Sequence, residues 1–442
     1  MIQISMSRFA HALMMRVYCQ AIGLAAFTGS PKARAWLAMR KGNLDRLQQA
    51  TNALAKDEDW LWFHCASVGE FEQAQPVMKA MRDQDKTLRF LLTFYSSSGW
   101  DFFAKKQPSW WEPSDCVAAM PLDAPADVRK CLAALTRPDA SKPSVRLFAL
   151  AKYDVWPELI AQLKPHAPLV LFAGHVIAGR WPFRLGGSFH RNAWRNLKKV
   201  LVQSESSVVE LERWGIEAIA LGDPRFDRVV EAEKNVRTSS DQSLKEWVGN
   251  RMCLVVGSAW EAESRIAQAA WTKGKACIVV PHEWDSSWAE GQRDEWVKRG
   301  AKAIVWSEFR RTGVEGSTAI PEADVILLDA MGHLMDAYGA GHLALVGGGF
   351  GKGVHNTLEP AAHGLAIWTG PKVERFAEVR ALVDCAALQS MKAEDDCAKS
   401  IRVAWGDPER IQEMGSAARK YAEENAGAGA RISSQLFELI ER

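Results

Sequence analysis

Short apolar runs alternate with stretches of helical periodicity along most of the chain after residue 60, and this alternation limits the possible folds more than any other feature. Strands that alternate with helices predict parallel sheets, because a parallel pair needs a crossover that is usually helical. The predicted strands are 60–65, 90–93, 145–150, 169–173 and 200–203 in a first series, and 252–257, 276–280, 303–306, 325–328, 343–346 and 366–369 in a second. Each series predicts one doubly wound α/β domain.

Composition agrees with two globular domains. The chain has 442 residues, more than one ordinary core accommodates. With 48% hydrophobic and 24% charged residues, it is predicted to be soluble and globular. A formal net charge of +2 provides no strong field for nucleic acid, so no nucleic-acid partner is expected. The eight cysteines are scattered without zinc spacing, which favours a reduced, cytosolic environment.

The start of the chain has a basic bias, because its lysines and arginines before residue 50 are opposed only by Asp45. The segment 9–27 is mostly apolar but contains His11, Arg16 and Gln20, so it suits an interfacial helix better than a bilayer span. An amphipathic helix packed on its own domain is the alternative. No convincing secretory cleavage site follows.

The first predicted strand ends in His64-Cys-Ala-Ser-Val-Gly-Glu70 and leads into a helix. Active sites of open parallel sheets lie at the carboxyl ends of strands, so Glu70 is expected at that edge. A carboxylate there suits a general base acting on a hydroxyl, and the preceding glycine lets a substrate approach. Complementing the helix dipole is an equally compatible role.

Lys152 and Asp154 follow the strand at 145–150 and are expected at the same edge. Either side chain is suited to orienting a substrate or to balancing a charge in the site. The alternative is an ion pair within a loop, before a helix that begins with proline.

Three polar turns follow strands of the second series: Ser258, Pro281 with His282, and Met331-Gly-His333. Ser258 and backbone amides at a helix start suit a phosphate, and His282 suits a phosphate or a base. Met331 and Gly332 are suited to border a nucleobase. Structural roles, such as a satisfied histidine or an N-cap turn, stay open for each turn alone.

A glycine-rich loop at 347–353 joins an apolar strand to a helix, as in a pocket for a nucleotide-sugar. Glycines supply positive φ and let a ligand approach the backbone. Asn356 is the expected N-cap, and Glu359 is expected to complete a capping box in a first turn that also carries His355. A well-capped helix without a ligand is the alternative, although a cap does not need so many glycines.

Other catalytic schemes lack their motifs. The sequence contains neither a G-x-x-x-x-G-K-[ST] loop nor a G-x-S-x-G nucleophile elbow. No convincing acidic triplet lies in a strand-end loop, so neither a metal nor another cofactor is expected.

Taken in order, these motifs resemble those of the Kdo transferases, which add 3-deoxy-D-manno-octulosonic acid (Kdo) to lipid A precursors in Gram-negative bacteria. Ser67-Val-Gly-Glu70 is similar to the catalytic motif of that family, and Asp154-Val-Trp-Pro157 to its acidic Trp-Pro motif. Gly222-Asp-Pro-Arg-Phe-Asp227 is similar to its inter-domain motif, and Gly353-Val-His-Asn-Thr-Leu-Glu-Pro360 to its donor-binding signature.

The resemblance implies a GT-B fold, in which two Rossmann-like domains face a cleft. It implies that Glu70 is the general base and that Asp154 and Arg225 steady the transition state. The donor is expected to be CMP-Kdo. The residues expected to bind its CMP part are Ser258, Pro281, His282, Met331, Gly332, His333, Gly353, His355, Asn356, Thr357, Leu358 and Glu359.

The expected organisation combines the strand series with this resemblance. It comprises a membrane-associated helix at 1–30, an acceptor domain at 31–222, a polar linker at 223–245, a donor domain at 246–425 and a final helix at 426–442 that crosses back.

The chain departs from the common family pattern at several positions. His282 stands where arginine is frequent, His333 where glutamate is frequent, and Lys152 where an acid is frequent. Glu158 replaces the usual asparagine after Trp-Pro, and Arg225 replaces lysine while keeping the charge.

The implied reaction is an inverting displacement. Glu70 deprotonates a glucosamine hydroxyl of a lipid A precursor, that oxygen attacks the anomeric carbon of Kdo, and CMP leaves. The implied location is the cytoplasmic face of the inner membrane, where the basic start of the chain meets anionic headgroups.

Three alternatives stay open. The first is a GT-B glycosyltransferase or epimerase that uses a UDP-sugar. The second is a nicotinamide-dependent oxidoreductase, which needs a glycine fingerprint where this chain has Ala66-Ser-Val-Gly-Glu70. The third is a catalytically silent, membrane-associated scaffold.

Overall fold

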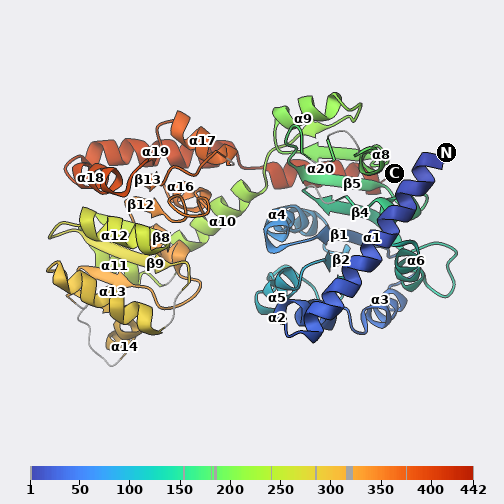
Figure 1. Cartoon of the computed structure of the whole chain (residues 1–442), viewed down its shortest axis with the longest axis horizontal. Coiled ribbons are helices and arrows are strands. Elements are labelled where there is room, and N and C mark those ends of the chain that lie inside the picture. The colour runs from blue at the N-terminus through green and yellow to red at the C-terminus, as the bar shows by residue number, and fades with distance from the viewer. Residues whose placement is uncertain are drawn as a thin grey trace. The chain divides into compact units, whose positions relative to one another are not determined.

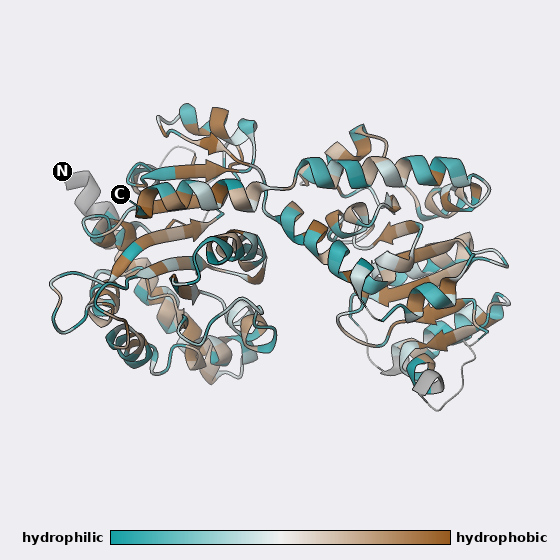
Figure 2. Cartoon of the chain, turned by 180° about the vertical axis from the view of Figure 1, so that it is seen from behind, coloured by the Kyte–Doolittle hydropathy of each residue, from teal (hydrophilic) through white to brown (hydrophobic). Residues whose placement is uncertain are grey.

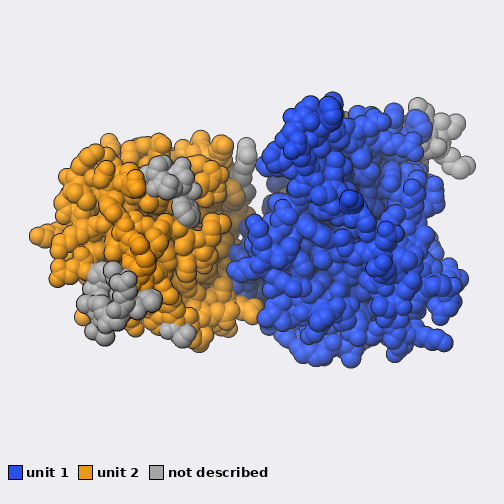
Figure 3. All heavy atoms as spheres, turned by 90° about the horizontal axis from the view of Figure 1, so that it is seen from below, with its two compact units in different colours: residues 1–228, 427–442 blue, residues 229–426 orange. Residues whose placement is uncertain are grey.

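The computed structural model describes residues 2–152, 155–180, 182–183, 187–239, 241–283, 286–314, 322–374 and 376–441. The chain divides into two compact units (Figure 3): unit 1 is formed by residues 1–228 and 427–442, and unit 2 by residues 229–426. Each unit contains one parallel sheet flanked by helices (Figure 1). The prediction of two doubly wound α/β domains is confirmed.

The described part of unit 1 contains a seven-stranded sheet in the order β3-β2-β1-β4-β5-β6-β7. The predicted strands of the first series are present, whereas β3 and β7 were not predicted. Both lie at edges of the sheet and are short: β3 has four residues with small or medium-sized side chains, and β7 has two. The strands are β1 (Trp60–Cys65), β2 (Arg89–Phe94), β3 (Cys116–Ala119), β4 (Val145–Ala151), β5 (Leu169–Gly174), β6 (Lys199–Val202) and β7 (Ile219–Ala220).

The helices of unit 1 connect these strands and begin and end the chain. They are α1 (Ile2–Phe27), α2 (Pro31–Ala38), α3 (Asn43–Asn52), α4 (Val68–Gln84), α5 (Ser97–Lys105), α6 (Pro125–Ala134), α7 (Pro157–Leu163), α8 (Ser188–Trp194), α9 (Glu205–Glu212) and α20 (Ala428–Ile440).

The described part of unit 2 also contains a seven-stranded sheet, in the order β10-β11-β9-β8-β12-β13-β14. The short edge strand β14 was not predicted. The strands are β8 (Cys253–Ala259), β9 (Ala276–Pro281), β10 (Ala303–Val305), β11 (Val325–Leu327), β12 (Leu343–Val346), β13 (Ala366–Thr369) and β14 (Leu388–Ser390).

The helices of unit 2 are α11 (Ser243–Val248), α12 (Glu261–Ala270), α13 (Ser286–Lys298), α14 (Trp306–Val314), α15 (Leu334–Ala340), α16 (Leu358–Ala362), α17 (Ala377–Asp384), α18 (Glu394–Ala404) and α19 (Pro408–Glu424). Helix α10 (Arg225–Thr238) contains the boundary between the units. The segment 223–245, expected to be a polar linker, is therefore largely helical.

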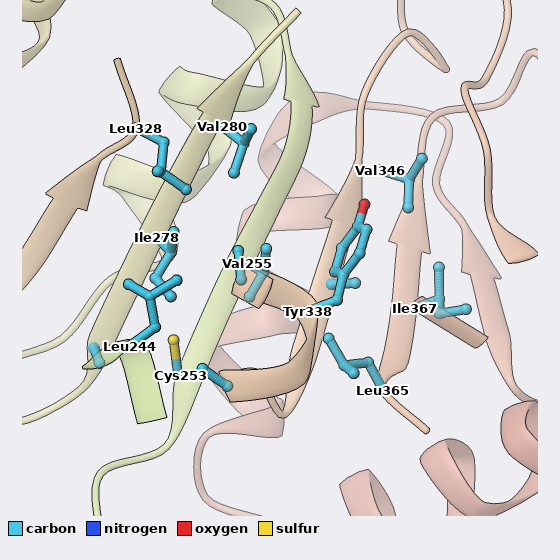
Figure 4. Close-up of a cluster of buried hydrophobic side chains, with 14 of the residues drawn as sticks. Leu244, Cys253, Val255, Ile278, Val280, Leu328, Tyr338, Val346, Leu365 and Ile367 are labelled. Atoms are coloured by element: carbon cyan, nitrogen blue, oxygen red, sulfur yellow. The ribbon is translucent and has the colours of Figure 1, made fainter. Parts of the chain in front are cut away.

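The central strands are buried on both faces, because helices cover both sides of each sheet. The hydropathy colouring in Figure 2 shows these strands as brown arrows between helices with teal outer faces. On one face of the sheet of unit 2, Val255 and Ile278 pack beside Val346 and Tyr338, as the close-up in Figure 4 shows. Full burial of one such aliphatic side chain contributes about 1.5–3 kcal/mol, so this face alone is a substantial core.

Helix α20 belongs to unit 1, although it follows unit 2 in the sequence. Its Gly429 packs against Pro76 of α4 so closely that an added Cβ atom would lie 3.0 Å from the Cβ atom of Pro76. Asp227 accepts hydrogen bonds from the backbone N–H groups of Gly427 (2.9 Å) and Gly429 (3.3 Å). Its carboxylate therefore caps the start of α20.

Among the described residues, no single helix is long and apolar enough to cross a bilayer. One helical pair, Arg8–Phe27 with Pro31–Asn52, satisfies the length and composition of a span, with a bend of 120° between its parts.

Replacing Asp227 tests the attachment of α20. Asp227→Ala removes both accepted hydrogen bonds and should destabilise the docked helix by about 1–2 kcal/mol, the usual effect of losing a cap. Hydrogen–deuterium exchange should show faster exchange of the α20 amides. Asp227→Asn keeps an acceptor oxygen and should exchange nearly as slowly as the wild type. Unchanged exchange in Asp227→Ala would contradict the capping role.

Candidate functional site

Glu70 lies in the first turn of α4, directly after β1. Ser67 is the N-cap, with extended backbone angles (φ −140°, ψ 172°), so the chain turns sharply from strand to helix. The Glu70 carboxylate accepts a hydrogen bond from the backbone N–H of Ala66, and the side chain is 4% exposed. An added Cβ atom at Gly69 would meet no atom within 4 Å, so packing does not require glycine there. Gly69 therefore borders open space, whereas the carboxylate of its neighbour Glu70 is buried.

His64, near the end of β1, is buried and neutral. Nδ1 of His64 is 3.0 Å from Oγ1 of Thr93 and 3.1 Å from its carbonyl oxygen, which ties the end of β1 to β2. Burial lowers the pKa of His64 to about 3. Burial and the nearby charge of Glu70 raise the pKa of the Cys65 thiol, so Cys65 is an uncharged, inert thiol rather than a nucleophile.

Arg225 is connected to the helix that carries Glu70. Its Nε atom donates to Oδ2 of Asp223 (2.7 Å), and its backbone N–H donates to Oδ1 (2.9 Å). Nε2 of Gln73 also donates to Oδ1 of Asp223 (3.3 Å). Gln73 is three residues after Glu70 and lies on the same side of α4. Sequence reasoning missed Asp223 and Gln73, although Asp223 stands inside the Gly222–Asp227 motif.

Asp154 lies outside the described residues. The residues around it follow β4, the neighbour of β1, with Leu150 paired to His64. Lys152 has a φ of 72°, a left-handed conformation that is uncommon for a residue with a side chain. Its backbone N–H donates to the carbonyl of Phe172 (2.8 Å).

The glycine-rich loop of unit 2 follows β12 and packs between neighbouring strand ends. An added Cβ atom would lie 1.9 Å from the carbonyl oxygen of Ser258 at Gly347, and 2.4 Å from Oγ1 of Thr369 at Gly349. Ser258, at the end of β8, itself has a φ of 52°. No side chain fits at these two glycines, so their backbone is held tightly against β8 and β13.

Glu263 anchors the same loop from α12. Its carboxylate accepts hydrogen bonds from the backbone N–H groups of Gly348 and Trp260, each at 3.1 Å. The residue is 1% exposed, and burial raises the pKa of its carboxyl group. No role was predicted for Glu263. Its place three residues after Trp260, at the start of α12, was the available signal, because a glutamate there reaches back to the N-cap.

Three aromatic rings form a stack beside this loop. The ring centroids are 4.6 Å apart for Trp260 and His282, and 4.3 Å apart for His282 and His355. Nε1 of Trp260 donates to Nε2 of His355 (3.0 Å). The Nε2 atom, as the acceptor, therefore carries no proton. Burial and His282 lower the pKa of His355. Trp260 was not predicted as a site residue.

The expected capping of the next helix is shifted. Helix α16 begins at Leu358 with Thr357 in the N-cap position, one residue later than predicted, but Thr357 makes no side-chain cap bond. Oδ1 of Asn356 instead accepts from the backbone N–H of Leu358 (3.0 Å). His355 and Asn356 thus precede the helix, and Glu359 lies in its first turn. Burial raises the pKa of Tyr338, and the nearby charge of Glu359 raises it further. The shift arises because a side chain two residues before an amide can bond to it in a turn.

Met331, Gly332 and His333 follow β11 at the same edge of the sheet. Met331 is 87% exposed, and Gly332 has a φ of 94°. Nδ1 of His333 is 3.2 Å from Oδ2 of Asp336, and its ring centroid is 5.3 Å from that of Trp306.

The strand order β11-β9-β8-β12 brings four predicted segments to one edge of unit 2. They are Met331 to His333, Pro281 with His282, Ser258, and Gly353 to Glu359. Direct contacts join His282 to His355, and close packing joins the glycine loop to Ser258. His333 contacts Trp306 and Asp336 instead. In the described residues, no group of three or more His, Cys, Asp or Glu side chains is arranged to hold a metal ion.

Residues 40–228 match the family described as 3-deoxy-D-manno-octulosonic-acid transferase (kdotransferase). The 3-deoxy-D-manno-octulosonic acid transferase of Bordetella pertussis is 26% identical to this chain, over 86% of this chain and 87% of its own. The transferase of the same name from Haemophilus influenzae is 24% identical over 93% of both chains. The matched family region contains both Glu70 and Arg225.

A solved structure is similar in fold. The putative UDP-N-acetylglucosamine 2-epimerase of Listeria monocytogenes has a TM-score of 0.56 at 10% identity, and covers 87% of this chain and 97% of its own. Similarity at this identity concerns the fold alone. It agrees with the expected fold of two doubly wound α/β domains and does not identify the donor.

The low pKa of His64 predicts a specific loss of stability in acid. His64 binds a proton near pH 6.5 in the unfolded chain but only near pH 3 in the folded chain. Its contribution to the free energy of unfolding is therefore fully present above pH 6.5 and is lost as the pH falls toward 3. The wild type should lose about 2 kcal/mol more than His64→Asn between pH 7 and pH 5. Urea unfolding at the two pH values measures this difference, and equal losses would contradict the assignment.

Proposed function

Because the motifs, the family match and the relatives agree on a Kdo glycosyltransferase, we propose that this chain transfers Kdo from CMP-Kdo to a glucosamine hydroxyl of a lipid A precursor. The transfer proceeds with inversion and releases CMP. The observation that carries this proposal is the buried carboxylate of Glu70, which accepts the backbone N–H of Ala66 in the first turn of α4, directly after β1.

Glu70 is proposed as the general base. The N–H of Ala66 holds one of its oxygens and favours the ionised carboxylate. The carboxylate takes the proton of the acceptor hydroxyl while that oxygen forms a bond to the anomeric carbon of Kdo. The bond from this carbon to the phosphate oxygen breaks, and its electron pair leaves with CMP. One displacement inverts the configuration.

Arg225 is proposed to steady the charge that develops on the leaving phosphate. Asp223 orients the guanidinium through its Nε atom, and Gln73 ties Asp223 to α4. A fixed cation near developing negative charge lowers the barrier, because no reorganisation is needed during the reaction. Asp154 is proposed to act with it, as the family resemblance implies.

The donor residues are proposed to lie at the carboxyl edge of the sheet of unit 2. The His282–His355 stack offers aromatic faces to a base or sugar, and the glycine loop packs against His355 at Gly348, where an added Cβ atom would lie 2.9 Å from the ring. Ser258, Pro281, Met331 to His333 and Gly353 to Glu359 are proposed to complete this site. We expect activity without a metal ion.

The membrane surface is proposed as the place of the reaction, at the cytoplasmic face of the inner membrane. Helix α1 exposes a row of large apolar side chains, among them Phe9 (72% exposed), Leu24 (65%) and Phe27 (87%). Exposed basic residues, including Arg16 and Lys32, lie on the same N-terminal segment. An apolar row flanked by positive charge suits a surface with anionic headgroups.

Glu70→Gln tests the base. The amide keeps the size of the side chain but cannot accept the hydroxyl proton, so turnover should fall by about 100-fold or more. Calorimetry should show unchanged CMP binding. The assay combines purified protein, CMP-Kdo and a tetraacylated lipid A precursor, with products measured by mass spectrometry. Retained turnover in Glu70→Gln would contradict the mechanism.

A pair of glycine variants tests the donor site. Gly349→Ala places a methyl group 2.4 Å from Oγ1 of Thr369 and must displace the loop, whereas the nearest atom at Gly351 is 3.6 Å away. Gly349→Ala should weaken CMP binding at least tenfold, a change of about 1.4 kcal/mol, and Gly351→Ala should bind normally. Equal binding by both variants would place CMP elsewhere. Tighter binding of UDP than CMP would favour the UDP-sugar alternative.

A further inference from the structure

Two polar contacts attach the inner face of α1 to the sheet edge of unit 1. Arg8 donates to both carboxylate oxygens of Glu158, from Nε (2.6 Å) and from Nη2 (2.5 Å). Nε2 of His11 lies 2.7 Å from Oδ2 of Asp123. Gln162 donates to Glu158 as well (2.5 Å), so this buried carboxylate is held from both sides.

Asp123 transmits the His11 contact to the start of α7. Its oxygens accept hydrogen bonds from the backbone N–H groups of Glu158 (3.2 Å) and Leu159 (2.9 Å), while the residue is only 1% exposed. A buried carboxylate is costly unless its acceptors are occupied, so His11 and α7 stabilise each other through it. Helix α7 begins immediately after the segment that carries Asp154.

The surroundings of His11 confine its ring. The rings of Phe189 and His190, on α8, have centroids 5.4 Å and 5.5 Å from that of His11. Within the described residues, Nδ1 of His11 is buried and has no hydrogen-bond partner. The polar contact of His11 is therefore directed to Asp123, through an Nε2–H donor.

A second group of contacts attaches the middle of α1 to the same edge. The ring of Tyr18 stacks on Tyr95, which follows β2, with centroids 6.3 Å apart. Tyr95 in turn packs on Trp156 (4.8 Å), the residue directly before α7, and Trp156 packs on His64 (5.4 Å). Trp36 packs on both Tyr18 (6.2 Å) and Tyr95 (5.9 Å), and the guanidinium of Arg40 lies 3.4 Å from the ring centroid of Trp36.

We propose that α1 contributes to catalysis at the sheet edge of unit 1 that carries Glu70. In this role, His11 and Arg8 are positioning residues. They hold the start of α7, and with it Trp156 against His64 at the end of β1, in the arrangement that the transfer requires. This inference rests on the proposed function. It adds a role for α1 that is separate from membrane attachment, because the exposed apolar side chains lie on the outer face and the polar contacts on the inner face.

Turnover of an acceptor dispersed in detergent separates the two roles, since membrane attachment is then irrelevant. His11→Ala and Arg8→Ala should lower kcat roughly 10- to 100-fold, as expected when a catalytic group is displaced by about 1 Å. CMP affinity and the KM for the donor should not change. His11→Gln, which can still donate an N–H to Asp123, should recover most of the rate.

Gln20→Ala is the matched control, because Gln20 is an exposed residue of the same helix. It should keep the wild-type kcat. A wild-type kcat in His11→Ala would show that α1 is an anchor only. A rate in His11→Gln as low as in His11→Ala would also overturn the proposal, because loss of packing and not of the hydrogen bond would explain it.

Hydrogen–deuterium exchange provides a readout that does not depend on activity. In His11→Ala the amides of residues 155–163 should exchange faster than in the wild type, whereas those of α12 in unit 2 should not change. If the wild type transfers no Kdo but exchange at 155–163 rises in the variant, the proposed function fails while the positioning contact stands. If exchange does not change, the positioning role is wrong.

Discussion

In both sheets every strand runs parallel to its neighbours, so each strand leads into its helix at the same edge. Parallel pairing requires crossovers that are usually helical, and helices on both faces bury the central strands. Only the turns at the strand ends are then left for polar chemistry. Glu70, Tyr95 and Lys152 follow the ends of neighbouring strands at such an edge in unit 1, and Ser258, His282 and the glycine loop lie at the corresponding edge in unit 2.

Buried carboxylates hold these turns in place by a recurring arrangement. Glu70 accepts the N–H of Ala66, Glu263 those of Trp260 and Gly348, and Asp123 those at the start of α7. Backbone N–H groups at turns need acceptors, and a buried carboxylate needs donors, so each requirement satisfies the other. Such a carboxylate has a structural role and can also take part in a reaction. The motif around Glu70 was therefore compatible with both interpretations when considered alone.

Sequence patterns were sufficient where a signal is local. Buried central strands are continuous apolar runs, and the turns after them carry the polar motifs, so the fold class and most candidate residues followed from the sequence. The patterns were insufficient for the edge strands β3, β7 and β14, which have only two to four residues each. They also placed the start of α16 one residue too early, although the side chain of Asn356 makes the capping bond that was expected of it.

The sequence by itself determined that the chain forms two doubly wound α/β domains, that Glu70 stands at a strand end, and that the ordered motifs resemble those of the Kdo transferases. Only the tertiary structure decided which side chains meet. Asp223 links Arg225 to Gln73 across 150 residues of sequence, His282 stacks on His355, and His11 reaches Asp123 from α1. These contacts depend on strand order and helix packing, which bring together residues distant in the chain, and no local pattern in the sequence encodes their distances.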